Sequence, residues 1–242
     1  MVLKQVRWQG EYFFGPAWIA YRGMSADNHV HAHAAVQLIV GSQVRVTDDE
    51  SYDNRADGWI LCSGVRHKVD AKGPVTILLI DPDAHLARSM TTASASKAEV
   101  IPMETEFVEK VKATKGIERV AKTLERTDMR RPGALDSRLR KALEYVRIAD
   151  KKLTLEVVCN AVGISPSRLR ALANKQLGTP FSKVVLWRKV SNACQLLAAG
   201  ASLSSAALGA GFADQAHLTR TMKDTIGLTP SQTKTVDTRL SK

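Results

Sequence analysis

Two segments in the second half of the chain repeat each other at a nearly constant offset. The pattern Leu-x-x-Val-Cys-x-x-x-Gly at residues 155–163 returns 48 residues later, at residues 203–211, as Leu-x-x-Ala-Ala-x-x-x-Gly. A Gly-Thr-Pro sequence that starts at Gly178 is echoed by a Gly-Leu-Thr-Pro sequence that starts at Gly227, with an offset of 49 residues. Self-similarity at a fixed period indicates that one supersecondary unit occurs twice.

Each copy has the residues expected of two helices that cross closely. A small residue in the first helix lets the second helix approach it, and Gly163 or Gly211 then supplies the backbone freedom of a tight turn. A capping residue follows, Ser165 in the first copy and Asp214 in the second, and it predicts the start of the next helix. This order is typical of a helix-turn-helix unit, whose second helix enters the major groove of DNA. Two ordinary helical hairpins are the alternative interpretation.

The net charge of the chain is concentrated in the repeated half. Residues 1–135 contain 18 Lys and Arg against 17 Asp and Glu, whereas residues 136–242 contain 17 against 7. The formal net charges of the two parts are therefore +1 and +10. Such an excess predicts a polyanionic partner for the second part alone, with nucleic acid the first candidate and an anionic membrane the second. A solvated basic surface is the alternative that charge leaves open.

The repeated part resembles the DNA-binding domain of the AraC/XylS family of bacterial transcription regulators. The resemblance is strongest in residues 203–230, which contain a Gly-Phe pair, a Leu-x-Arg step and a closing Gly-x-Thr-Pro. It implies seven helices, with one long helix at about Pro180–Ala198 that holds two recognition helices about one DNA turn apart. The first copy departs from the family, because it has Ala171 where Arg is usual and Ala173 where Phe is usual.

The candidate DNA contacts are the residues of each recognition helix that lie outside its apolar face and can therefore point toward the groove. In the second copy Leu218 and Met222 are expected to point inward, so that Arg220 can bond to guanine and Gln215 to adenine. Some of the Lys and Arg would contact phosphates only, which positions the protein without reading sequence. The candidate DNA-binding residues are Ser167, Arg168, Arg170, Asn174, Lys175, Gln215, His217, Thr219, Arg220 and Lys223.

The first part of the chain has the pattern of a β-rich domain. Turn signals, among them residues 41–42, 53–54 and 57–58, separate short apolar runs. The expected strands are Ala17–Tyr21, Val36–Ile39, Val44–Val46, Trp59–Leu61 and Val75–Ile80. Residues 104–126 then show helical periodicity, which Gly116 interrupts.

Four polar side chains in this part form a second candidate site. The pattern His31-x-His33-x-x-x-Gln37, followed by Gly-x-x-His67, is similar to the two motifs of cupin barrels. The resemblance implies that His31, His33 and His67 would ligate a divalent metal such as zinc, nickel or iron. Gln37 departs from the family, because it stands where cupins have Glu, and Gln is a poorer ligand.

We favour a metal-free interpretation of the same residues, in which no cofactor is required. AraC-type sensor domains resemble cupins, and this implies a pocket for a small organic effector in which the histidines are polar or structural groups. The candidate effector-binding residues are His31, His33, Gln37 and His67, with apolar walls from Trp18, Tyr21 and Trp59.

The expected fold is therefore multidomain. It consists of an N-terminal cupin-like β-barrel or jelly roll (residues 1–96), a helical linker that is a candidate dimerisation element (97–135), and an all-α double helix-turn-helix domain (136–242). No apolar run reaches the ~20 residues of a membrane helix, and the first ten residues lack the apolar segment of a signal peptide.

These features predict a cytoplasmic, sequence-specific transcription regulator that is not an enzyme. Its expected partners are double-stranded DNA, a small-molecule effector, RNA polymerase and a second copy of the chain. We take it to be an activator, with repression the alternative. A metal-sensing regulator and a metal-dependent cupin enzyme are the alternatives. The enzyme hypothesis leaves the basic repeat unexplained.

Overall fold

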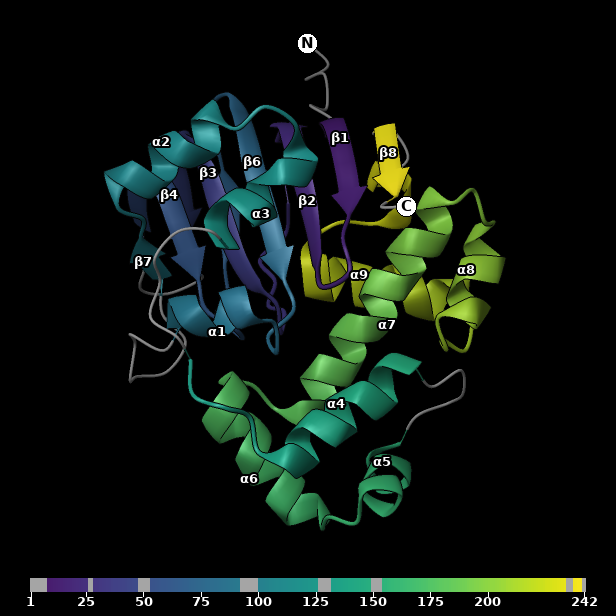
Figure 1. Cartoon of the computed structure of the whole chain (residues 1–242). Helices are drawn as coiled ribbons and strands as arrows, with labels where there is room; N and C mark the ends of the chain where they lie inside the picture. The colour runs from purple at the N-terminus through teal and green to yellow at the C-terminus, as the bar shows by residue number, and fades with distance from the viewer. Residues whose placement is uncertain are drawn as a thin grey trace.

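The computed structural model describes residues 8–25, 28–47, 53–91, 100–125, 132–148, 154–233 and 237–240. The chain forms an N-terminal sheet with helices packed on it and a C-terminal group of helices that lies against the sheet (Figure 1). The expected boundary between residues 96 and 97 falls outside the described residues.

One sheet contains all the strands of the described residues. Its order is β7-β4-β3-β6-β2-β1-β8, and β5 pairs with β3 outside that path. All pairs are antiparallel except β1 with β8, which brings the two ends of the described chain together. The strands are β1 (Gln9–Phe14), β2 (Trp18–Met24), β3 (Val36–Thr47), β4 (Asp53–Leu61), β5 (Lys68–Asp70), β6 (Pro74–Ile80), β7 (Val100–Pro102) and β8 (Asp237–Leu240).

The central strands are longer than local sequence signals predict. The segments 36–39 and 44–46, expected as two strands, are parts of β3, and an irregularity of the β3–β4 register takes up the expected turn at 41–42. The expected turns at 53–54 and 57–58 are also wrong, because both lie inside β4. Pairing of β3 with β4 on both sides of the irregularity outweighs the turn preference of these Asp, Asn and Gly residues.

The helices of the N-terminal part pack on one face of the sheet. They are α1 (His85–Thr91), α2 (Thr105–Ala113), the 3₁₀ helix η1 (Ile117–Arg119) and α3 (Val120–Glu125). The predicted interruption is confirmed, since Gly116 has φ 82° between α2 and η1. Val108, Val111 and Leu124 are buried in one apolar cluster with residues of the sheet. The apolar face of the candidate dimerisation element is therefore covered by its own chain.

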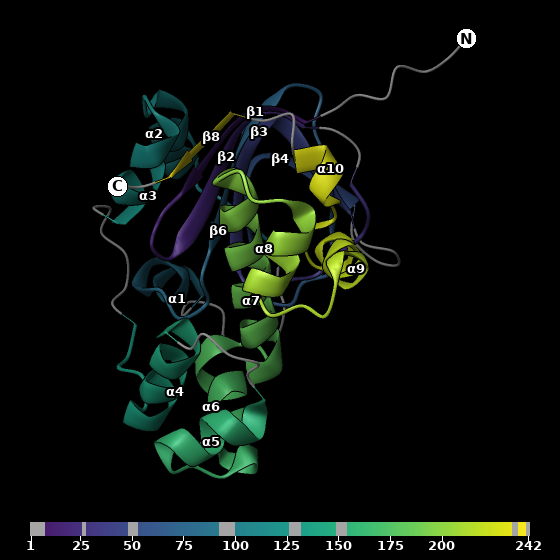
Figure 2. The ribbon, with the colours of Figure 1, turned by 90° about the vertical axis from the view of Figure 1, so that its right-hand side faces the viewer.

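The described residues of the C-terminal part form the seven helices that the family resemblance implies. They are α4 (Ser137–Ile148), α5 (Leu155–Val162), α6 (Pro166–Leu177), α7 (Phe181–Ala198), α8 (Leu203–Gly209), α9 (Gln215–Ile226) and α10 (Pro230–Thr233). The long connecting helix, predicted at about Pro180–Ala198, is α7, and its 18 residues span about 27 Å. Figure 2 shows α7 running beside the sheet, with α4 to α6 at one end.

The two parts share one hydrophobic core. Phe14, Ile19 and Ala35 of the sheet region are buried in the same cluster as Trp187 and Val184 of α7. Burial of this shared apolar surface stabilises the contact between the two parts. Among the described residues, no helix is both long enough and apolar enough to cross a membrane.

Candidate functional site

The two repeated units are helix-turn-helix motifs joined by α7. The first consists of α5 and α6, and the second consists of α8 and α9. Gly163 and Gly211 take positive φ angles of 65° and 76° in the two turns, as the sequence predicts. Ser165 and Asp214 cap α6 and α9, since each side chain accepts a hydrogen bond from the backbone N–H three residues on.

The apolar face of each recognition helix is buried as predicted. Leu218 and Met222 of α9 are fully buried, and so is Leu169 at the corresponding place in α6. Ala173, which stands where the family usually has Phe, is also fully buried, so the first unit closes around a smaller side chain.

The ten predicted DNA contacts lie on the outer faces of α6 and α9. Nine of them are exposed, and Thr219 is half-buried. The Thr219 hydroxyl donates to the Gln215 carbonyl oxygen at 2.8 Å. The His217 ring packs edge-on against Phe212, with ring centroids 5.3 Å apart. The exposed residues are Ser167, Arg168, Arg170, Asn174, Lys175, Gln215, His217, Arg220 and Lys223.

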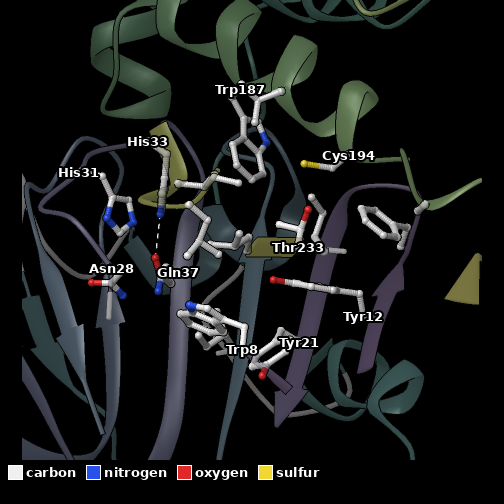
Figure 3. A pocket seen from close by; sticks show the side chains of 18 of the residues that line it. Trp8, Tyr12, Tyr21, Asn28, His31, His33, Gln37, Trp187, Cys194 and Thr233 are labelled. Atoms are coloured by element: carbon white, nitrogen blue, oxygen red, sulfur yellow. Dashed lines mark hydrogen bonds between the residues drawn. The ribbon is translucent and has the colours of Figure 1, made fainter. Parts of the chain in front are cut away.

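A cavity of about 390 Å³ lies between the sheet and the helical part (Figure 3). Its walls come from three places: the sheet region, one side of α7, and the segment from the end of α9 to α10. The sheet region contributes Trp8, Tyr12, Phe14, Ile19, Tyr21, Asn28, His31, His33, Gln37, Val69, Ile77 and Leu79. The helical part contributes Trp187, Val190, Cys194, Leu197, Ala198, Ile226, Leu228 and Thr233.

A cluster of three buried histidines lies at one end of the cavity. In each of His31, His33 and His67, Nδ1 lies 2.8–3.0 Å from a backbone carbonyl oxygen two residues away. A carbonyl can only accept, so each Nδ1 carries a hydrogen and donates it. The three rings are buried side by side, and none of the described residues that line the cavity is Asp or Glu, so positive charges on them would have no partner there and the rings are neutral. Burial accordingly lowers the pKa of all three rings, that of His31 to about 3. Each Nε2 is therefore a bare acceptor.

Gln37 binds two of these acceptors. One end of its side-chain amide lies 2.7 Å from His33 Nε2 and 3.0 Å from His67 Nε2. If that end were the carbonyl oxygen, both rings would need a second proton and would bear buried positive charges. Turning the amide by 180° exchanges its oxygen and nitrogen without moving other atoms. We therefore assign the NH₂ group to this end, where its two hydrogens satisfy both rings.

The histidine cluster also has the chemistry of a metal site. One ring nitrogen from each of His31, His33 and His67 lies within 4.8 Å of the others. Imidazoles that donate Nδ1–H to a backbone carbonyl are oriented as metal ligands commonly are. With its amide turned the other way, Gln37 would offer a carbonyl oxygen as a fourth donor. The donor set thus fits a divalent metal as well as the metal-free network.

Two aspartates of the loop after β6 fasten the connecting helix to the sheet domain. The Asp81 carboxylate accepts a hydrogen bond from Trp187 Nε1 at 2.6 Å and a second one from Arg188. Asp83 accepts from Arg188 at 2.8 Å and from Arg147 of α4 at 3.1 Å. Burial raises the pKa of Asp81, and the Arg188 charge opposes that shift.

The second recognition helix ends against the histidine cluster. Gly227, the C-cap of α9, has φ 71°, and its carbonyl oxygen accepts a hydrogen bond from His29 N–H at 3.4 Å. A Cβ at Gly227 would lie only 2.7 Å from His31 Nδ1. The end of α9 is therefore in direct contact with the polar end of the cavity.

Comparisons with known proteins match the helical part. A family described as a helix-turn-helix domain matches residues 158–235. The arabinose operon regulatory proteins of Salmonella typhimurium and Escherichia coli are 35% and 34% identical to this chain over 104 residues. This part of the chain is a helix-turn-helix domain similar to that of AraC-type regulators, and we refer to it below as the AraC-type domain. These alignments cover 40% of this chain and 36% and 35% of the two relatives, so the chain spans about a third of their length.

Solved structures resemble the whole chain in fold. The match to ToxT from Vibrio cholerae O395 covers 90% of this chain and 97% of the ToxT chain, with a TM-score of 0.58 and 12% sequence identity. A further structure of that protein, with an unsaturated fatty acid bound, has a TM-score of 0.58 and covers 90% of this chain and 95% of its own. The expected fold class, a cupin-like β-barrel or jelly roll followed by an all-α double helix-turn-helix domain, is confirmed.

The cavity includes only some of the residues predicted for it. His31, His33, Gln37 and Tyr21 line it. His67 is not in the lining, but its Nε2 lies 3.0 Å from the Gln37 side-chain amide. Trp18 and Trp59 do not line it. Trp18 stacks on Phe13 at 5.4 Å, and Trp59 Nε1 donates to the Val44 carbonyl oxygen at 2.9 Å.

Strand alternation alone could have separated these candidates. Trp18 and Tyr21 are three residues apart on β2 and therefore face opposite sides of the sheet. Tyr12 and Phe14, which the sequence interpretation missed, pair with Tyr21 and Ile19 in the β1–β2 register and share the cavity face. The α7 side of the AraC-type domain offers no such local signal, because only tertiary packing brings it to the sheet.

Proposed function

We propose that the chain is a sequence-specific transcription regulator whose DNA affinity depends on a small molecule in the cavity. In this proposal α6 and α9 read the major groove of double-stranded DNA through the exposed residues described above. Arg220 contacts guanine, and part of the Lys and Arg set contacts phosphates. The chain performs no catalysis.

One observation carries this proposal: the cavity has walls from both the sheet domain and the AraC-type domain. A molecule inside it would contact α7, which joins the two recognition units, and the end of α9. Its binding energy would therefore depend on how the two domains are placed. Such differential binding is what lets a ligand shift a conformational equilibrium.

The lining supports an apolar organic molecule as the effector. Aromatic and aliphatic side chains form most of the walls, and a few polar groups gather at the histidine end (Figure 3). Concave sites of this size and composition are typical of small-molecule binding. The fatty acid bound by ToxT supports an apolar ligand for this fold as well.

The partners and location follow from the same proposal. Because the proposed target is bacterial promoter DNA, we infer that the chain acts in the cytoplasm in contact with RNA polymerase. We take it to be an activator, with repression the alternative. We also infer a homodimer. Since the apolar face of α2 and α3 is covered by the sheet, their outer faces would provide the contact.

Selection from a random-sequence duplex library, followed by gel shifts, tests DNA recognition. We expect enrichment of one sequence and binding to it that falls steeply with salt concentration, because basic residues contact phosphates. No enrichment over random competitor at low salt would contradict the proposal.

A metal-sensing regulator is a second candidate function, and the three-histidine donor set favours it. His31, His33 and His67 would hold the metal, which would supply a fixed positive charge next to the end of α9. Metal analysis of protein purified without a His tag tests this function. One zinc or nickel per chain, lost in His33→Ala, would support it over the organic effector.

A further inference from the structure

We propose that the cavity takes an uncharged, mainly aromatic molecule with one hydroxyl group, which donates a hydrogen bond to His31 Nε2. This inference rests on the proposed function, because it names the class of effector for the same cavity. Three features carry it: the lack of charge in the walls, the one open acceptor among the histidines, and the aromatic side chains around the remaining space.

The first feature is the absence of ionic side chains. Among the lining residues that the structure describes, none is Lys, Arg, Asp or Glu. Burial also raises the pKa of the Cys194 thiol to about 12 and raises the pKa of Tyr12, so both groups are neutral. A carboxylate or phosphate in this cavity would lose its hydration without gaining a cationic partner. Buried charges without such a partner are strongly disfavoured.

The second feature is the hydrogen-bonding state of the histidine cluster. All three Nδ1–H groups donate to the backbone, and the Gln37 amide donates to His33 and His67. Among the described residues, His31 Nε2 has no hydrogen-bond partner, and His31 lines the cavity. His31 Nε2 is therefore an acceptor that a donor group on a ligand could satisfy, and leaving it unsatisfied costs free energy.

Asn28 completes the preference for a hydroxyl. Its Oδ1 accepts a hydrogen bond from Val69 N–H at 3.2 Å, which fixes the orientation of the amide. The Asn28 Nδ2 group is then available as a donor at the same end of the cavity, beside His31 (Figure 3). A hydroxyl can donate to one group and accept from the other, whereas an ether or a ketone can only accept.

The third feature is the shape of the apolar walls. Trp8 and Tyr12 both pack against Tyr21, and their ring centroids lie 5.0 Å and 4.9 Å, respectively, from that of Tyr21. Trp187 faces these rings from α7 (Figure 3). Aromatic side chains offer flat surfaces that suit a flat aromatic ligand, by stacking or by edge contact.

Isothermal titration calorimetry of the full chain with three probes of similar shape tests the inference. The probes are 2-naphthol, which can donate, 2-methoxynaphthalene, which cannot, and 2-naphthoate, which is charged. We expect 2-naphthol to bind about tenfold more tightly than either of the others, as the loss of one hydrogen bond or the burial of a charge requires. Equal or tighter binding of 2-naphthoate would overturn the inference, and so would no binding of any probe.

Variants locate the contact. His31→Phe keeps an aromatic ring but removes the acceptor, so 2-naphthol should bind no better than 2-methoxynaphthalene. His29→Phe is the matched control, because His29 is exposed and outside the lining, and it should keep the preference. Ala198→Trp fills the cavity from α7 and should abolish binding of 2-naphthol, which gives a second test if His31→Phe does not fold. A preference that survives His31→Phe, or stoichiometric zinc binding that requires His31, would overturn the inference.

Gel shifts on the selected DNA separate this inference from the proposed function. If the chain binds its DNA specifically but no probe behaves as expected, only the effector class is refuted. If the chain shows no DNA preference, the proposed function fails whatever the calorimetry shows.

Discussion

The contact between the end of α9 and the histidine cluster can be measured with one pair of substitutions. Gly178 and Gly227 occupy the same position at the ends of the two recognition helices, with φ angles of 67° and 71°. A Cβ at Gly178 would have no heavy atom within 4 Å, whereas at Gly227 it would lie 2.7 Å from His31 Nδ1 and 3.0 Å from the His29 carbonyl oxygen. Gly178→Ala is thus a control that introduces the same backbone strain as Gly227→Ala but no contact with a neighbouring atom.

The structure gives the expected sizes of the two effects. An alanine in the left-handed conformation costs roughly 1–2 kcal/mol at either site. At Gly227 a further cost arises, because the His31 ring must move and weaken its hydrogen bond to the His29 carbonyl oxygen. Overpacking and the lost hydrogen bond together add roughly 1–3 kcal/mol. Gly227→Ala should therefore lower the free energy of unfolding by more than Gly178→Ala does, and the difference should be roughly 1–3 kcal/mol.

Equilibrium unfolding in guanidinium chloride, followed by tryptophan fluorescence and by circular dichroism, measures the difference. The two probes must give coincident transitions for the comparison to hold. If the two variants differ by less than about 0.5 kcal/mol, the end of α9 is not packed against His31 in solution. The proposed route from the cavity to the second recognition helix would then be refuted.

Four further substitutions, the last of them a control, test other parts of the molecule. Arg220→Ala should weaken specific DNA binding by ~1–3 kcal/mol in gel shifts, and unchanged affinity would remove Arg220 from base recognition. Asp81→Ala leaves Trp187 Nε1 without its acceptor and removes one of the two carboxylates that bind Arg188, and it should cost roughly 3 kcal/mol of unfolding free energy. A loss below about 1 kcal/mol would show that Asp81 contributes little to holding α7 on the sheet domain. Leu218→Ala should cost roughly 2–5 kcal/mol, because this side chain is fully buried. Leu208→Ala, at a 66% exposed position, should change stability by about 0.5 kcal/mol at most, and similar losses for both would contradict the packing of α8 on α9.

The helical part was predictable because its signals are local. Helix ends depend on capping residues and on glycines a few positions away, so Ser165 and Asp214 located the starts of α6 and α9, and α7 begins within one residue of its predicted start. Helical periodicity likewise identified Leu218 as a buried residue.

The sheet was predicted less well because its strands depend on partners that are distant in sequence. The polar half of β4 carries turn residues and becomes a strand because it pairs with residues 44–47 of β3. The strands β1, β5, β7 and β8 were missed. β5, β7 and β8 have only three or four residues, too few to show a periodicity of their own, and β1 becomes a strand through its pairing with β2 and β8.

The candidate site was predicted only on its sheet side, for the same reason. The histidine motif has a fixed spacing, so His31, His33 and His67 could be identified and do cluster. The opposite wall depends on where α7 packs, and neither Trp187 nor Cys194 has a sequence pattern that points to the sheet. Gln37 illustrates a further limit, because its role as a donor to two imidazoles depends on tautomers that geometry fixes.

The position of the cavity determines how a ligand can act in the proposed mechanism. The hydrogen bonds from Trp187 and Arg188 to Asp81, together with the shared core, already hold α7 against the sheet. A ligand therefore does not need to create that contact. The ligand replaces solvent between walls from two domains, and its binding free energy is most favourable when both walls are in place. Its binding therefore stabilises the docked arrangement of α7 and α9, and the effect on DNA affinity equals the effect of DNA on ligand affinity. Whether occupancy strengthens or weakens DNA binding then depends only on which arrangement of the two recognition helices fits the duplex.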